Sequence, residues 1–108
     1  MKVRNGPKVE SERFDDLDTV LEAIESRGRE LAGASRAGAV GGGLMRRVEP
    51  VQQVTARIQL AGPNGLRAGV DVRGDGSAEA WTGWLRRHVV EQQAGESPYD
   101  ALKRVATA

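Results

Sequence analysis

The residue types that most often carry out chemistry are sparse in this chain. His88 is the only histidine, and there are no cysteines. Acid–base catalysis or metal binding by His88 would need partners close in space, for which Asp71 and Glu91 are the candidates. A histidine on the surface of a strand is the favoured interpretation. We therefore expect no catalytic residues, no metal site and no cofactor, and we favour a function other than catalysis.

Two further motifs have structural interpretations that are favoured over ligand binding. The segment from Asp71 to Glu79 partly matches a calcium loop. Arg73 and Thr82, however, stand where that loop needs first a carboxylate or amide and then a glutamate. The run Gly41-Gly42-Gly43 lacks the Gly-Lys-Ser/Thr ending of a phosphate loop. We interpret the first segment as a turn and the second as part of a linker.

A group of arginines beside a tryptophan gives the strongest functional signal. Guanidinium groups around an exposed indole can stack a base and hold phosphates. Two alternatives stay open: Arg67 and Arg86 only stack on Trp84, or the first helix covers this face. Gln59 belongs to the same face of the expected sheet, and Arg46 and Arg47 lie near its edge. The expected binding residues are Arg57, Arg67, Arg73, Trp84, Arg86 and His88.

Two alternating runs joined by a short loop predict the hairpin that carries this face. Apolar and polar residues alternate over residues 54–60 and again over 66–72, with residues 61–65 between them. Folding the runs together separates an apolar face from a polar face, as a half-buried hairpin requires. This register pairs Ile58 with Ala68, Ala56 with Val70, and Val54 with Val72.

The next turn decides which tryptophan lies on which face. Asp75-Gly76 is a strong signal for a two-residue loop, which would pair Gly74 with Ser77. A three-residue loop would invert the following strand and bury Trp84. The two-residue loop is favoured, although it sets Glu79 opposite Val72. A third strand is then expected over residues 78–91. Trp84 lies opposite Arg67 on its polar face, and its apolar face carries Trp81, Leu85 and Val89.

The rest of the chain supplies an arm, two helices and a linker. We expect residues 1–13 to be a flexible arm, 14–32 an amphipathic helix and 33–43 a Gly/Ala linker. Residues 44–108 hold the strands and a C-terminal helix, which begins with a capping box at Ser97 and Asp100 and with Pro98 in its first turn. The expected fold is one small α+β domain: helix, three-stranded antiparallel meander, helix, with both helices packed on one face of the sheet. The stripe of the first helix is Phe14, Leu17, Leu21, Ile24, Gly28 and Leu31.

Composition excludes some classes of protein. The 108 residues carry 16 Lys and Arg against 15 Asp and Glu, so overall charge alone does not indicate nucleic acid. Without cysteine there are no disulfides and no thiolate zinc sites. No apolar run approaches the roughly 20 residues of a membrane span, and no secretory signal is evident. We expect a cytoplasmic protein without a membrane partner, and the excess of Arg, Gly and Ala indicates a bacterial source.

The expected order of elements over residues 15–106 resembles that of double-stranded-RNA-binding domains. That family carries a lysine-rich cluster at the start of its last helix, where this chain reads Glu96-Ser97-Pro98-Tyr99-Asp100. The linker before the first strand is also longer than the family's connection, so the resemblance transfers no binding residue. The segments of residues 49–54 and 69–77 are similar to uncharacterised small bacterial proteins, and this resemblance implies no activity.

These observations favour a non-enzymatic binding or assembly module that self-associates, as a dimer, through the helix stripe or a sheet edge. A three-stranded sheet with one short helix makes a thin core, and open sheet edges invite pairing. The alternative is a nucleic-acid-binding protein that uses the Arg/Trp face. A third possibility is a small-molecule site or an enzyme formed between protomers.

Overall fold

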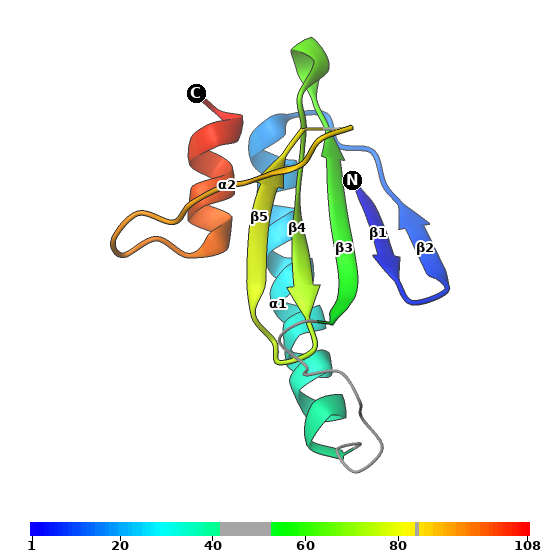
Figure 1. Ribbon diagram of the computed structural model, residues 1–108. Coiled ribbons are helices and arrows are strands. Elements are labelled where there is room, and N and C mark those ends of the chain that lie inside the picture. Colours follow the sequence, from blue (N-terminus) through cyan, green and yellow to red (C-terminus); the bar gives the residue numbers. More distant parts are fainter. Residues whose placement is uncertain (42–52, 84) are drawn as a thin grey trace.

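In the part of the chain that the structure describes, a single antiparallel sheet and two helices make up the fold (Figure 1). The computed structural model describes residues 1–41, 53–83 and 85–108. The helices are α1 (Leu17–Gly41) and α2 (Pro98–Ala106), and a 3-10 turn covers Pro63–Gly65. The sheet has six strands in the order β2-β1-β3-β4-β5-β6. They are β1 (Lys2–Asn5), β2 (Lys8–Ser11), β3 (Val54–Ala61), β4 (Arg67–Arg73), β5 (Ala78–Thr82) and β6 (His88–Val89).

The α+β class is confirmed, but the sheet has six strands where the sequence predicted three. Two of the three additional strands come from residues 1–13, which form the β1–β2 hairpin instead of a flexible arm. Gly6 makes the turn with a φ of 60°, a conformation that glycine adopts without strain. Val3 faces Ile58 on β3 and is only 3% exposed. The ladder between β1 and β3 and the burial of Val3 together dock the hairpin on the sheet.

The β3–β4 hairpin has the predicted apolar face, but its register is shifted by two residues. Ile58 pairs with Val70 and Ala56 with Val72, instead of with Ala68 and Val70. The centre of the loop lies one residue later than in the predicted register. The Gly62 amide donates to the Leu66 carbonyl at 2.9 Å and closes the loop. Since the shift is an even number, the faces stay the same. A bulge between Val54 and Ala56 sets Val54 opposite Arg73 and leaves it 40% exposed.

The β4–β5 turn is the three-residue loop, the less favoured of the two alternatives that the sequence left open. The Arg73 amide donates to the Ser77 carbonyl at 2.8 Å, and Gly76 adopts a positive φ of 86°. Ala78 and Ala80 therefore face the core, and Glu79 leaves the apolar face and forms an ion pair with Arg73. The predicted placement of Trp81 on the apolar face is wrong by one residue of register. Trp84 lies outside the described residues.

The third predicted strand, residues 78–91, is much shorter than expected. β5 ends at Thr82, and Gly83 follows with a φ of 100°. A Cβ at Gly83 would collide with the Arg86 carbonyl, so the chain can turn here only with glycine. The two-residue β6 then pairs back onto β5. Leu85 is 91% exposed and Val89 58% exposed, so neither joins the core as predicted.

The first helix is longer than predicted and absorbs most of the expected linker. α1 continues to Gly41, so residues 33–41 are helical, while 42–43 lie outside the described residues. Its predicted stripe is mostly buried, with Leu21, Ile24 and Leu31 at most 7% exposed. Near its C-terminal half, the hydroxyls of Ser35 and Thr55 lie 2.7 Å apart and join the helix to β3. Tertiary packing thus overrides the weak helix propensity of glycine here.

The second helix begins as the sequence predicted. The Ser97 hydroxyl accepts from the Asp100 amide at 3.1 Å, and the Asp100 carboxylate accepts from the Ser97 amide at 3.0 Å. Pro98 occupies the first turn. These bonds satisfy helix N–H groups that would otherwise lack partners, and they lower the pKa of Asp100. The capping box is therefore confirmed.

Both helices pack against the same face of the sheet and leave the other face open (Figure 1). One core cluster joins Ile24 of α1 and Leu102 of α2 to Ile58, Val70 and Val72 of the sheet. α1 contacts β3 and β4, and α2 contacts β4 and β5. The arrangement departs from the double-stranded-RNA-binding layout by the N-terminal hairpin and the sixth strand. No helix in the described ranges combines the length and apolarity that crossing a membrane requires.

Candidate binding face

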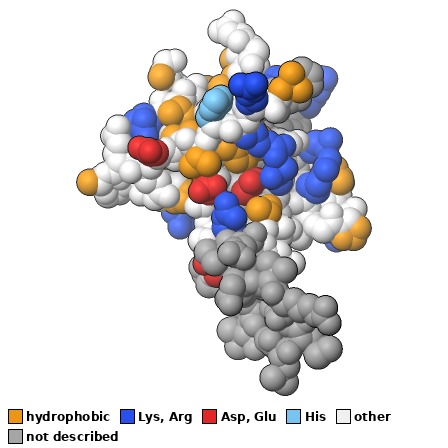
Figure 2. Space-filling model, viewed as in Figure 1, with side chains coloured by type: hydrophobic (Ala, Val, Ile, Leu, Met, Phe, Trp, Pro, Cys, Tyr) orange, Lys and Arg blue, Asp and Glu red, His pale blue; other side chains and the backbone are white. Residues whose placement is uncertain are grey.

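The sheet face opposite the helices is the candidate functional surface, called the open face below. Strand alternation places Trp81 here, together with the cationic side chains that Figure 2 shows gathered on this side of the molecule. Two carboxylates, Asp71 and Glu79, lie among them. The cationic side chains of the open face in the described ranges are Lys2, Arg4, Arg57, Arg67, Arg73 and Arg87.

Arginines on neighbouring positions neutralise both carboxylates. Arg57 donates to Asp71 through two nitrogens, at 2.7 and 3.1 Å, from the adjacent strand. The hydrogen bond to Asp71 raises the pKa of Arg57, against the opposing effect of burial. Arg73 lies 2.9 Å from Glu79. The negative charge of this face is therefore compensated within the sheet, and a net positive charge remains.

Trp81 lies flat on the open face and is held from three sides. Its Nε1 donates to Asp71 at 3.1 Å. Beneath it lies Gly69, where a Cβ would come within 2.5 Å of the Trp81 ring and would also collide with the Ile58 carbonyl. Above it, the Arg87 guanidinium lies 4.6 Å from the ring centroid, a cation–π contact. Trp81 is only 5% exposed because Gly69 and Arg87 enclose its two faces.

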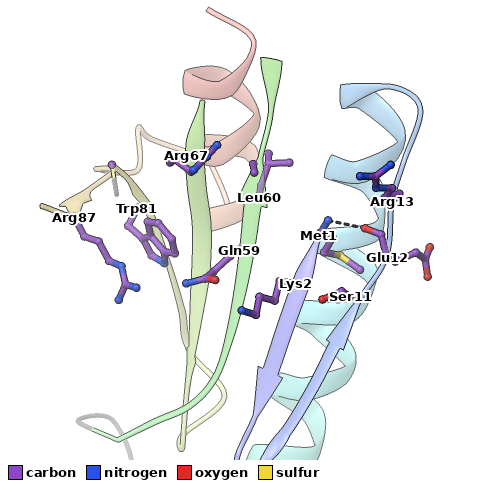
Figure 3. Close-up of a pocket in the computed structure, with 12 residues that line it drawn as sticks. Met1, Lys2, Ser11, Glu12, Arg13, Gln59, Leu60, Arg67, Trp81 and Arg87 are labelled. Carbon is purple, nitrogen blue, oxygen red and sulfur yellow. Dashed lines mark hydrogen bonds between the residues drawn. The ribbon is translucent and has the colours of Figure 1, made fainter. Parts of the chain in front are cut away.

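A hollow of about 350 Å³ adjoins this tryptophan. Trp81 and Arg87 form one wall, the β1–β2 hairpin forms the opposite wall, and β3 and β4 form the floor (Figure 3). Gln59 and Lys2 extend from adjacent strands toward the space between the walls, and Arg67 lies at one end. The Met1 amino group donates to the Glu12 carbonyl at 2.8 Å and ties the far wall together.

The structure brings together only part of the predicted binding set. Arg57, Arg67 and Arg73 share the open face as expected, and Arg57 is committed to Asp71. Arg86 is exposed next to Arg87, and His88 is exposed in β6 opposite Thr82. Trp84, Arg46 and Arg47 lie outside the described residues. The aromatic side chain at the centre is Trp81, which the sequence analysis had assigned to the core.

The residues that the sequence analysis missed had detectable signals. Lys2 and Arg4 flank the apolar Val3 and precede Gly6-Pro7, the two-residue turn of the hairpin, in which glycine takes the first central position. Trp81 and Arg87 follow from the three-residue turn. Its signal was the unfavourable position of Glu79 opposite Val72 in the two-residue loop that the sequence favoured. In that sense the burial of one carboxylate was the evidence against the predicted register.

The open face carries cationic side chains that can contact anions. In the described part of the chain, no three His, Asp or Glu side chains lie close enough to hold a metal ion. Fold and face together define an α+β protein whose antiparallel sheet has a cation-rich face that neither described helix covers. In comparisons with known proteins, no family model, curated protein or solved structure matches the chain.

Proposed function

We propose that this protein is a non-enzymatic binding module whose open face binds nucleic acid. The observation that carries the proposal is the segregation of charge. The whole chain has a net charge of +1. Within the described ranges, six cationic side chains share one sheet face with two carboxylates that arginines already neutralise. A polyanion that docks on such a face releases its counterions, which supplies affinity without base recognition.

The layout of the face supports an extended ligand over a compact anion. Lys2 and Arg4 project from β1, next to Arg57 on β3, while Arg67 lies on β4 and Arg87 beyond β5. Neighbouring strands are about 4.8 Å apart, so charges on β1 and β4 are separated by roughly 10 Å. That spacing exceeds the size of one phosphate group, so the cations at the two ends contact separate phosphates of an extended strand.

Binding to labelled oligonucleotides at several salt concentrations tests the proposal. We expect fluorescence anisotropy to detect binding that weakens as salt rises, with a log–log slope of about −0.7 for each phosphate contact on a single strand. The double variant Lys2→Ala/Arg4→Ala should bind several-fold more weakly and with a shallower slope. Absence of salt-dependent binding by the wild-type protein would refute the nucleic-acid function.

Lys103→Ala supplies the matched control for lost charge. Lys103 is exposed on α2, which packs on the other side of the sheet. The variant loses the same kind of charge without touching the open face, so its affinity should equal that of the wild type. Equal weakening in both variants would mean that the total charge, not the open face, governs binding.

Self-association is the second candidate function, but the helix stripe no longer supports it. Leu21 and Ile24 are buried in the protomer's own core, which leaves the sheet edge as the route for pairing. The supporting observation is that Leu85 and Val89 are exposed by 91% and 58% beside the outer strand β6. Pairing of β6 with a second copy would bury both and extend the sheet.

Light scattering on the purified protein tests this second candidate. We expect a dimer at micromolar concentration for the wild type and a monomer for Leu85→Asp. Glu91→Lys, an exposed change near the same strand, serves as a control that should leave the dimer intact. A wild-type monomer at that concentration would remove self-association from consideration.

A further inference from the structure

The hollow beside Trp81 combines a flat aromatic ring, an amide and several cations. Trp81, Gln59 and Lys2 occupy one row of the sheet, because Lys2 pairs with Gln59, Gln59 with Gly69, and Gly69 with Trp81. Figure 3 shows these side chains facing the same space, with Arg67 and Arg87 at its rim. A pocket of about 350 Å³ lies at the lower end of the range for small-ligand sites.

Trp81 is held as a stacking surface, and within the described residues an exposed arginine covers its outer face. The bond to Asp71 fixes the ring edge, and Arg57 in turn fixes Asp71 with two hydrogen bonds. Gly69 lets the inner face lie directly on the strand. Among the described residues, the exposed Arg87 places its guanidinium over the outer face. A planar base can replace a planar guanidinium in that position, since both stack on an aromatic ring.

We propose that this hollow accepts one unpaired nucleotide of a single strand. The base stacks on Trp81 in place of Arg87, and the Gln59 amide, which both donates and accepts, hydrogen-bonds its edge. Lys2 and the displaced Arg87 hold the flanking phosphates. This inference rests on the proposed function and specifies that the nucleic acid is single-stranded. Bases stacked inside a duplex present no free face to Trp81, so a duplex does not enter the hollow.

Tryptophan fluorescence in a Trp84→Phe background tests the inference, because Trp81 is then the sole tryptophan. A single-stranded oligonucleotide should quench Trp81 and bind at least about tenfold more tightly than an abasic strand with the same phosphates, given the usual contribution of base stacking. Abasic strand and duplex should leave the fluorescence unchanged. Gln59→Ala should weaken the single strand several-fold and leave the abasic strand unaffected.

Arg29→Ala is the matched control for Arg87→Ala, because Arg29 also covers an aromatic ring, that of Tyr99, at 5.2 Å. Arg87→Ala should change the Trp81 emission of the free protein and reduce strand affinity, whereas Arg29→Ala should do neither. Equal, salt-dependent binding of normal and abasic strands without quenching would overturn the hollow and leave the proposed function standing. If the wild-type protein bound no oligonucleotide at all, both the hollow and the proposed nucleic-acid function would be overturned. Quenching by a mononucleotide as strong as by the strand would make a free nucleotide the occupant and overturn the strand assignment.

Discussion

Tyr99 packs its ring against the backbone of α1 at Gly28, so these two residues act as a pair. A Cβ at Gly28 would lie 2.7 Å from ring carbon Cε1 and would overlap the hydroxyl. Gly28→Ala should therefore lower the free energy of unfolding by about 1–3 kcal/mol, although alanine favours helix by about 1 kcal/mol. Chemical denaturation measures this difference.

Gly33→Ala in the same helix is the control for that substitution. Nothing lies within 4 Å of a Cβ built at Gly33. Here only the helix propensity changes, and the variant should gain up to about 1 kcal/mol of stability. If Gly28→Ala stabilises the protein as Gly33→Ala does, the packing of Tyr99 against α1 is wrong.

The Tyr99 hydroxyl predicts an unusual response to alkaline pH. It is buried without a hydrogen-bond partner in the described part of the chain, and burial raises the pKa of Tyr99, partly opposed by the nearby Arg29 charge. Because the folded-state pKa lies above the ordinary value of 10.0, the stability that depends on the neutral Tyr99 hydroxyl is fully present below pH 10.0. It is lost as pH rises through the folded-state pKa. Tyr99→Phe should gain about 1 kcal/mol at neutral pH and unfold less readily above about pH 10. Thermal melts across that range would contradict the prediction if wild type and variant declined in parallel.

At the scale of elements, the capping box accounts for where α2 begins. Ser97→Ala removes the acceptor for the Asp100 amide and should lower the free energy of unfolding by about 1 kcal/mol. Ser97→Asp keeps an acceptor at the cap and should retain most of the stability. Equal losses in the two variants would show that the cap bonds do not stabilise the helix.

The sequence predicted correctly those features that depend on residues only a few positions apart. The capping box and the apolar face of β3–β4 follow from spacings of a few residues, and both are observed. The turn after β4 could not be settled locally, because Asp75-Gly76 fits both a two-residue loop and a three-residue loop. The environment of Glu79 distinguishes the two loops. The two-residue loop would place Glu79 on the apolar face, whereas the three-residue loop lets it pair with Arg73. One residue of register moved Trp81 from the core to the open face.

At the scale of the whole molecule, the N-terminal hairpin was missed because its evidence is long-range. Its pattern has a single inward apolar residue, Val3, and the partner strand begins some fifty residues later. Burial on Ile58 is what converts a weak local hairpin into part of the sheet. The same docking brings Lys2 and Arg4 to the open face, so the hairpin matters for binding as well as for folding.

A pair of valines in the hairpin tests whether it is docked. Val3 is 3% exposed and Val9 is 52% exposed, although the two lie on adjacent strands. Val3→Ala should lower the free energy of unfolding by about 2 kcal/mol through lost burial and a residual cavity, whereas Val9→Ala should change it by less than about 0.5 kcal/mol. If both changes were neutral in denaturation, residues 1–11 would be a dispensable arm. Lys2 and Arg4 would then no longer be fixed beside Arg57, and the open face would lose the cations that make it wide enough for an extended strand.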